Sequence, residues 1–335
     1  MGLSAWLTRC FSQPDSRWYI VDHPNERSLH TRPTPRTGGV AIAAAIAVGV
    51  LFALFWLEAD MGRLAWLGAG GLLVAGISFL DDRLDLSPAL RFVVQVLVAA
   101  LLVNTGFSIT HVDLPGVSFV LEGTVGVAVS GLFIVWMMNL YNFMDGMDGF
   151  AGGMSVIGFA TLGWLGAAAG HDLFALLSLV VAAAALGFLF FNFPPARIFM
   201  GDVGSSVLGL LAAAMSLWGI SERVFPFWTP VLVFSPFIFD ATATLIRRLY
   251  KGERVWRAHK THYYQRLVQL GWGHRRTVLR EYGLMIGCAL SAIWAISSSV
   301  LIQWLVIGGW VVAYGLLARF VISREAQHAS FPSGT

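Results

Sequence analysis

The chain has 335 residues, of which 57% are hydrophobic and only 12% are charged, and its formal net charge is +3. So apolar a composition excludes an ordinary soluble domain, and 36 glycines and 13 tryptophans are typical of proteins that cross a membrane several times. The two cysteines, Cys10 and Cys288, lack metal-ligand spacing, so neither a zinc site nor a disulfide is expected. The charge balance indicates the membrane as a partner and no nucleic acid.

The apolar segments predict the architecture. A spanning helix needs roughly 20 apolar residues, and ten segments approach that length: 39–58, 63–80, 90–106, 124–141, 150–169, 172–193, 203–220, 225–246, 282–300 and 302–320. If the residues before 39 are cytoplasmic and the segments alternate, every Lys and Arg except Arg63 and Arg223 falls on the cytoplasmic side. That distribution satisfies the positive-inside rule. We therefore expect one all-α polytopic membrane domain over residues 1–335.

Two stretches differ from the spans. Residues 1–11 are too short to cross a membrane and Arg9 interrupts them, so they are a truncated helix, an interfacial segment or the end of a longer span. Residues 107–121 alternate apolar and polar side chains around Pro115-Gly116. This pattern predicts a small β-hairpin on the outer face of the membrane.

Two adjacent carboxylates close the second apolar segment. Asp81 and Asp82 follow the run that ends at Leu80. Because the carboxyl end of a helix carries partial negative charge, a metal ion or a nearby arginine, Arg83 or Arg91, has to compensate them. The plain alternative is that these acidic residues only mark a loop.

A second acidic motif, NFMDGMDG, spans residues 142–149. Asn142, Asp145 and Asp148 recur at every third position, so they share one stripe if the preceding helix continues through them. An amide and two carboxylates on one stripe suit a metal ion, a ribose or a base edge. The alternative is a glycine-rich turn that joins two spans.

The third acidic motif, FMGDVGSS, covers residues 199–206. Pro194-Pro195 stop the preceding helix, and Gly204 and the serines after it open a span whose free N–H groups attract anions. Asp202 is the first candidate for a metal ligand. Mg²⁺ fits best, with Mn²⁺ as an alternative, because hard cations prefer oxygen ligands and phosphate partners. The simpler interpretation of Asp202 is an N-cap.

A long basic loop over residues 247–280 carries two histidines. His259 and His262 lie three positions apart and would share a face with Arg266. The apolar spacing that follows predicts a short amphipathic helix on the membrane surface, ending at Gly271. Its cationic face suits a pyrophosphate or a lipid phosphate, whereas the bland alternative is a loop that only sets topology.

Further polar residues lie near the same helix ends. Arg36 precedes Thr37-Gly38-Gly39, which could form a small anion-binding turn. Asn192 and Asp240 lie near cytoplasmic helix ends, where each is either a pocket residue or a packing hydrogen bond, and the depth favours function.

These motifs together resemble the polyprenyl-phosphate N-acetylhexosamine-1-phosphate transferases, a glycosyltransferase family 4-like group. The resemblance rests on PNERSLHTRPTPRTGG, the Asp-Asp pair, NLYNFMDGMDG, the N-F-P-P-A-R-I-F-M-G-D-V-G-S-S stretch with its inserted Phe193, and the histidine loop. It implies ten or eleven spans in a bacterial inner membrane, with the active-site cleft facing the cytoplasm. It also implies transfer of N-acetylhexosamine-1-phosphate from a UDP-sugar to undecaprenyl phosphate, with release of UMP, and it allows a homodimer.

The resemblance assigns roles to the candidate residues. Asp81 would be the general base or a covalent nucleophile, and we prefer direct attack by the acceptor phosphate with Asp81 as base. The full candidate site comprises the catalytic groups Asp81, Asp82, Asp145, Asp148, His259 and His262, the substrate-binding groups Asn142, Asn192, Arg36 and Arg266, and the metal ligand Asp202.

The chain also departs from the family pattern. Three consecutive histidines mark the peptidoglycan branch, and H-K-T-H stands here instead, which favours the O-antigen or surface-polysaccharide branch. The cytoplasmic segment 1–38 is expected to lack the first family helix. The alternative from another class is an ion- or proton-coupled secondary transporter that uses the same acids, although transporters place such groups near the bilayer midplane.

Overall fold

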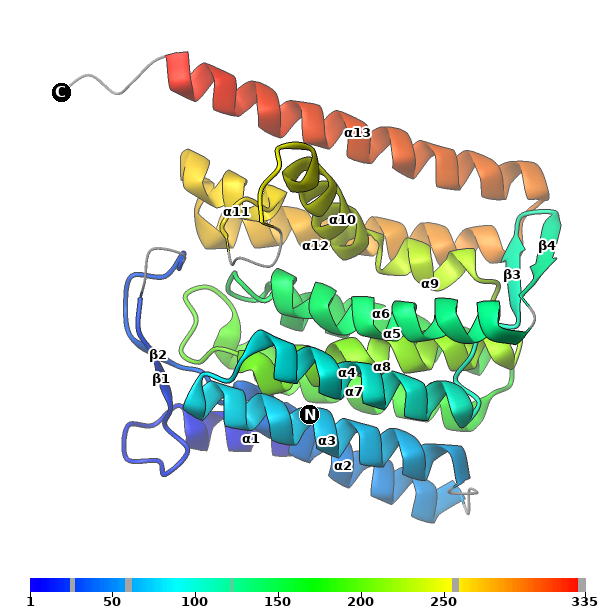
Figure 1. Cartoon of the computed structure of the whole chain (residues 1–335), viewed down its shortest axis with the longest axis horizontal. Coiled ribbons are helices and arrows are strands. Elements are labelled where there is room, and N and C mark those ends of the chain that lie inside the picture. The colour runs from blue at the N-terminus through cyan, green and yellow to red at the C-terminus, as the bar shows by residue number, and fades with distance from the viewer. Residues whose placement is uncertain (25–27, 58–61, 122, 255–258, 331–335) are drawn as a thin grey trace.

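The computed structural model describes residues 1–24, 28–57, 62–121, 123–254 and 259–330. Within these ranges, eight helical segments are long and apolar enough to cross a membrane. They are α2 (Gly38–Leu57), α3 (Gly62–Leu84), α5 (Gly123–Met144), α6 (Phe150–Ala168), α7 (Asp172–Asn192), α8 (Gly201–Ser221), α12 (Gly273–Ile296) with the short helix before it, and α13 (Val300–Ser330). The predicted all-α polytopic architecture is confirmed (Figure 1).

Two predicted spans take a different form. The segment 90–106 is a shorter helix, α4 (Pro88–Asn104), capped by Ser87. The segment 225–246 breaks into α9 (Trp228–Val233) and α10 (Ser235–Tyr250), which run in different directions in Figure 1. A proline in the first turn of α10 explains the break, because proline fits a helix start and cannot donate to the preceding turn.

Helix α8 forms the centre of the bundle. Of its apolar window 94% is buried, whereas only 11% of the window of α13 is buried. Small residues allow the close packing: a Cβ on Gly209 would lie 2.6 Å from the carbonyl oxygen of Met137 on α5. Because α8 begins at Gly201, this packing places Asp202 at the centre of one end of the bundle.

The N-terminal residues form α1 (Gly2–Phe11), which packs against α2 and α7. The Ser4 hydroxyl donates a hydrogen bond of 2.7 Å to the Ala184 carbonyl, and a Cβ on Gly187 would lie 2.4 Å from the Met1 carbonyl oxygen. Residues 1–11 are thus a short helix packed on the bundle.

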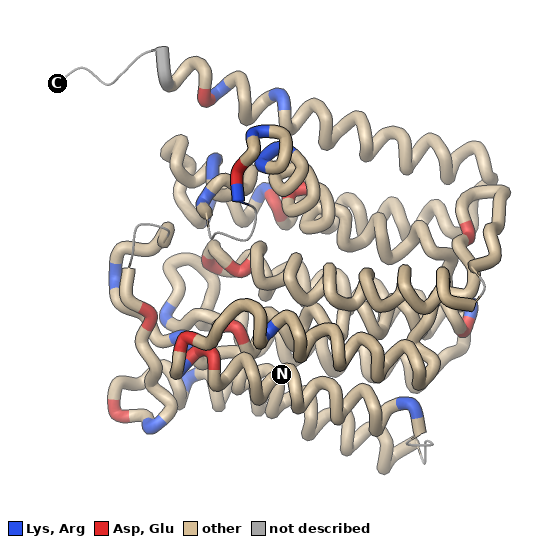
Figure 2. Tube along the Cα trace, viewed as in Figure 1, with Lys and Arg blue, Asp and Glu red and all other residues tan. Residues whose placement is uncertain are grey.

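Two small hairpins lie at opposite ends of the bundle (Figure 1). Strands β3 (His111–Leu114) and β4 (Val117–Val120) pair antiparallel, which confirms the predicted hairpin. At the other end, β1 (Val21–Asp22) pairs with β2 (Thr34–Pro35). Figure 2 shows that most charged residues gather at the β1–β2 end, as the alternation of spans requires.

The basic loop 247–280 contains α11 (Tyr263–Leu267) followed by a π-helical turn (Val268–Trp272). Gly271 has a φ of +87°, a backbone conformation that glycine adopts readily, and it lies where the predicted short helix was expected to end. Residues 255–258 of this loop, like 25–27 of the N-terminal motif, lie outside the described residues.

Candidate active site

An acidic cavity of about 260 Å³ lies at the charged end of the bundle. Six of the predicted site residues line it: Arg36, Asp82, Asp145, Asp148, Asn192 and Asp202. The lining also includes residues that were not predicted for the site, among them Asp22, His30, Gln265 and His274.

The glycines of two separate motifs bring the cavity walls together. The amides of Gly38 and Gly39 donate to the carbonyls of Phe199 and Met200, at 3.0 and 2.7 Å. A Cβ on Gly39 would lie only 2.1 Å from the amide nitrogen of Gly204. The prediction that residues 37–39 form an anion-binding turn is therefore wrong, because both glycine amides already have backbone acceptors.

Asp82 joins the end of α3 to the start of α8. A Cβ on Gly201 would lie 3.1 Å from Asp82 Oδ2, so this carboxylate stands at the first turn of α8, where backbone amides have no partner within the helix. Arg36 Nε lies 3.5 Å from Asp82 Oδ1, and another guanidinium nitrogen donates to the Asp82 carbonyl. Asp82 thus holds the turn that carries Asp202.

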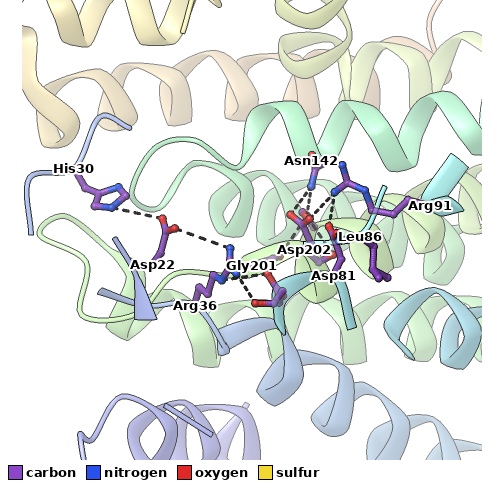
Figure 3. Close-up of polar contacts among 11 residues, drawn as sticks. Asp22, His30, Arg36, Asp81, Leu86, Arg91, Asn142, Gly201 and Asp202 are labelled. Atoms are coloured by element: carbon purple, nitrogen blue, oxygen red, sulfur yellow. Dashed lines mark hydrogen bonds and ion pairs between the residues drawn. The ribbon is translucent and has the colours of Figure 1, made fainter. Parts of the chain in front are cut away.

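Arg91 bridges the carboxylates of Asp81 and Asp202 (Figure 3). Its Nη1 lies 2.5 Å from Asp81 Oδ2 and 2.9 Å from Asp202 Oδ2. The amide of Leu86 also donates to Asp81, at 2.8 Å. An arginine does compensate the Asp-Asp pair, as predicted, whereas Arg83 lies over the ring of Phe79 instead. Asp81 is adjacent to the cavity but does not line it.

Asn142 approaches Asp202 from α5. Its side-chain amide donates to Asp202 Oδ1 at 2.8 Å and to the Ser205 hydroxyl at 3.2 Å. Each Asp202 oxygen therefore accepts one hydrogen bond from a side chain, and each keeps further acceptor capacity.

The NFMDGMDG motif does not continue the helix. Helix α5 ends at Met144, so Asp145 and Asp148 lie in a turn and the predicted shared stripe is wrong. Gly149 ends this turn with a φ of +75°, and a Cβ on Gly146 would lie 2.4 Å from the Tyr264 hydroxyl. The glycines are required by this backbone path and by the close approach of α11.

The carboxylate of Asp145 has no hydrogen-bond or ion-pair partner among the described residues, and Asp145 lines the cavity. Burial, reinforced by the nearby Asp202 and Asp82, raises the pKa of its carboxyl well above the usual value. A carboxylate at this position therefore requires a positive charge to be stable in its ionised form.

Asp148 and Asn192 hold the turn in place. Asp148 Oδ2 accepts from the Ala196 amide at 3.0 Å, and Oδ1 lies 3.0 Å from His274 Nδ1 at the start of α12. The Asn192 side chain accepts from the Gly149 amide and donates to the Ile198 carbonyl, both at 2.9 Å. Both residues line the cavity while their polar atoms also bind neighbouring segments.

The structure does not place His259, His262 or Arg266, the predicted site residues of the basic loop, in the lining of the acidic cavity. His262 Nδ1 lies 3.2 Å from Asp240 Oδ1, and the buried Arg266 is paired with Glu325 on α13. The predicted shared face of His259, His262 and Arg266 is therefore wrong, because His259 precedes α11 and the other two side chains have separate partners. The two histidine rings still lie 4.8 Å apart.

His259 is half-buried within this loop. Burial, and then the neighbouring His262, lower its pKa to about 4. His259 is therefore neutral near pH 7, and its ring accepts from Thr261 at Nδ1 or donates to it, at 2.9 Å.

The β1–β2 segment supplies a chain of charges over the cavity (Figure 3). Asp22 Oδ2 lies 3.5 Å from His30 Nε2, and Asp22 Oδ1 lies 4.0 Å from Arg36 Nη1. His30 was visible in the N-terminal motif, but Asp22 and His274 have no sequence signal of their own.

Among the residues that the structure describes, no three acidic, histidine or cysteine side chains stand close enough to hold a metal ion by themselves. Mg²⁺ commonly takes only one or two carboxylates and completes its coordination with water and substrate phosphates. Asp145 and Asp202 provide such oxygens at the cavity wall.

Known proteins share these features. The profile of glycosyl transferase family 4 matches residues 64–220. A probable undecaprenyl-phosphate N-acetylglucosaminyl 1-phosphate transferase of Bacillus subtilis is 35% identical over 302 residues, which cover 89% of this chain and 84% of the relative. A decaprenyl-phosphate N-acetylglucosaminephosphotransferase of Mycobacterium leprae is 32% identical, covering 91% of this chain and 85% of the relative.

A more distant relative is the undecaprenyl-phosphate alpha-N-acetylglucosaminyl 1-phosphate transferase of Yersinia pestis, which is 29% identical over 93% of this chain and 86% of its own length. The similarity to the first two relatives covers about nine-tenths of this chain. The chain belongs to the polyprenyl-phosphate N-acetylhexosamine-1-phosphate transferases of glycosyl transferase family 4.

Proposed function

We propose that this protein transfers N-acetylhexosamine-1-phosphate from a UDP-sugar to undecaprenyl phosphate and releases UMP. The observation that carries the proposal is the convergence of three acidic motifs on one cavity at the charged end of a membrane bundle. The names of the relatives make UDP-N-acetylglucosamine the first donor to test. The product would start a lipid-linked surface polysaccharide such as an O-antigen.

The charge of the cavity supports a divalent cation as cofactor. Among the described residues, five aspartates line it against one arginine: Asp22, Asp82, Asp145, Asp148 and Asp202 against Arg36. A pyrophosphate donor would be repelled by this surface unless a cation accompanied it. Asp145, whose carboxylate has no partner among the described residues, and Asp202 would hold Mg²⁺ or Mn²⁺ there. When bound, the cation would neutralise the pyrophosphate and stabilise the leaving UMP.

The residues of this chain would then position the reactants. Asp81 would accept the proton of the acceptor phosphate, which is already acidic, so a base with an ordinary carboxyl pKa is sufficient. Arg91 orients Asp81 and Asp202 relative to each other through its two short contacts. Asp82 and Asn142 keep Asp202 at the start of α8.

We propose further that the charged end faces the cytoplasm of a bacterium, because the basic residues lie there. A transporter would use such acids near the bilayer midplane within repeats. Here the acids lie at one end of the bundle and the relatives above are transferases, so nothing favours that alternative.

The test is UMP release by the purified chain with undecaprenyl phosphate, Mg²⁺ and a panel of UDP-N-acetyl sugars. Release should require both the lipid and the metal. Asp202→Ala and Asp81→Asn should each abolish turnover, whereas Asp113→Asn in the hairpin at the opposite end should retain it. Near-normal turnover in either of the first two variants would remove its assigned role, and release without lipid would refute the transferase.

A further inference from the structure

A second cavity, of about 390 Å³, lies on the other side of α11 from the acidic cavity. It is enclosed by α10, α11, α12 and α13, and its size is within the range of ligand pockets. Leu267, Leu284, Leu317, Phe320 and Val321 give it a largely apolar wall. The proposed transfer reaction does not use this space.

Basic and acidic side chains lie in and beside this cavity: Arg280 and Glu281 line it, and Arg324 lies next to it over the ring of Phe320. The guanidinium of Arg280 lies 4.0 Å from the ring centre of Trp272, and that of Arg324 lies 5.3 Å from the ring centre of Phe320. Both rings line the cavity. Neither arginine makes an ion pair with a described residue, so their N–H edges can still bind phosphate oxygens while the planes stack on the rings.

Glu281 is the second carboxyl group of this cavity, beside Asp240. It lines the cavity, and within the described parts of the chain no group donates a hydrogen bond to its carboxylate. Asp240 also lines the cavity, but His262 Nδ1 and the amides of Tyr263 and Tyr264 already contact its carboxylate oxygens, at 3.2, 2.9 and 3.0 Å. Glu281 is therefore the carboxylate that can accept an external cation.

We propose that this cavity, referred to below as the lipid cavity, binds a zwitterionic aminophospholipid of the membrane. Its hydrocarbon chain would lie against the apolar wall, its phosphate near Arg280 and Arg324, and its ammonium at Glu281. The position supports a lipid. The cavity lies between α10, α11, α12 and α13, and Figure 2 shows charged residues on the ends of these helices, where lipid headgroups would meet the protein. A purely anionic lipid such as a polyprenyl phosphate offers nothing to Glu281 and would be repelled by it.

Binding of phosphatidylethanolamine and phosphatidylglycerol to the purified full chain in detergent, measured by native mass spectrometry, tests the proposal. A charge-assisted hydrogen bond at a partly buried carboxylate corresponds to a preference of about tenfold for phosphatidylethanolamine. Glu281→Gln, which keeps the side-chain shape, should abolish that preference. Equal affinities in the unaltered protein, or an unchanged preference in Glu281→Gln, would overturn the assignment.

A second pair of variants tests the place of binding. Ala318→Trp should fill the lipid cavity and remove phosphatidylethanolamine binding, because Ala318 lines it. Leu316→Trp is the matched control, since Leu316 is on the same helix, 62% exposed, and not part of the lining. Undiminished phosphatidylethanolamine binding in Ala318→Trp would refute the site. Displacement of phosphatidylethanolamine from this cavity by undecaprenyl phosphate at equal concentration would also refute it.

Discussion

Arg91 is the cation that allows Asp81 and Asp202 to approach each other. Its Nη1 contacts one oxygen of each carboxylate, and its side chain is 33% exposed while that of Asp81 is 7% exposed. Replacing it by Met keeps the length of the side chain and removes the charge. The two carboxylates, which come from α3 and α8, then lose their shared partner.

The expected loss of stability follows from those two contacts. Hydrogen bonds to charged groups contribute about 1.5–3 kcal/mol each, and solvent screening at this exposure reduces that to about 1 kcal/mol each. The total of about 2 kcal/mol corresponds to a decrease in melting temperature of about 4 °C in a chain of this size class. Mg²⁺ should restore part of the decrease, because a divalent cation at Asp202 would replace the lost positive charge.

The assay is thermal unfolding of Arg91→Met in detergent at one scan rate, with Mg²⁺ and with a chelator. Arg83→Met is the matched control, because Arg83 carries the same charge in the last turn of α3, close to Arg91 in the sequence, and makes no ion pair with a described residue. A melting temperature of Arg91→Met equal to that of the control in the presence of chelator would refute the reasoning.

Three other variants test separate parts of the structure. Gly39→Ala should destabilise the protein by about 1–3 kcal/mol or prevent folding, because its Cβ would lie 2.1 Å from the Gly204 amide nitrogen. The control is Gly76→Ala, whose Cβ would have no atom within 4 Å, and it should unfold like the wild type in the same thermal assay. Asp240→Asn should lower the melting temperature and raise the KM for the UDP-sugar severalfold, because the weaker acceptor loosens the amides that begin α11; an unchanged KM in steady-state kinetics would contradict this. His259 has a folded pKa of about 4, below its ordinary value of 6.5, so the unfolded chain binds the extra proton first and stability falls as the pH decreases from about 6.5 toward 4. Thermal unfolding at pH 7 and pH 5 should therefore show a smaller acid-induced decrease in His259→Gln than in the wild type, and an equal decrease would refute this origin.

The spans could be predicted from sequence because few backbone structures are stable in the hydrocarbon of a membrane. Every backbone polar group has to be satisfied within the segment, so long apolar runs become helices. Average hydropathy is insensitive to where a helix restarts, which is why the break between α9 and α10 was missed. Pro236 was visible, but proline also occurs within spanning helices, so only the packing of the surrounding helices decides the outcome.

The acidic motifs could be assigned to one site because alternation of the spans brings their ends to the same side. Their partners could not be predicted, since each pair joins segments far apart in the chain. Asp148 meets His274, and Arg266 meets Glu325. Two basic residues of the same loop thus pair with carboxylates in different places. His274 lines the cavity, whereas Arg266 is buried away from it.

Helix α11 lies between the two cavities and contributes residues to the lining of each. Gln265 lines the acidic cavity, while Tyr263 and Leu267 line the lipid cavity. A helix of five residues is too short to be stable by itself, so its position depends on the carboxylate of Asp240 and on the atoms packed against each side. A lipid that fills one side restricts the same turn that presents Gln265 to the other. If the proposed lipid binds there, the composition of the membrane would affect the acidic site through these contacts of α11.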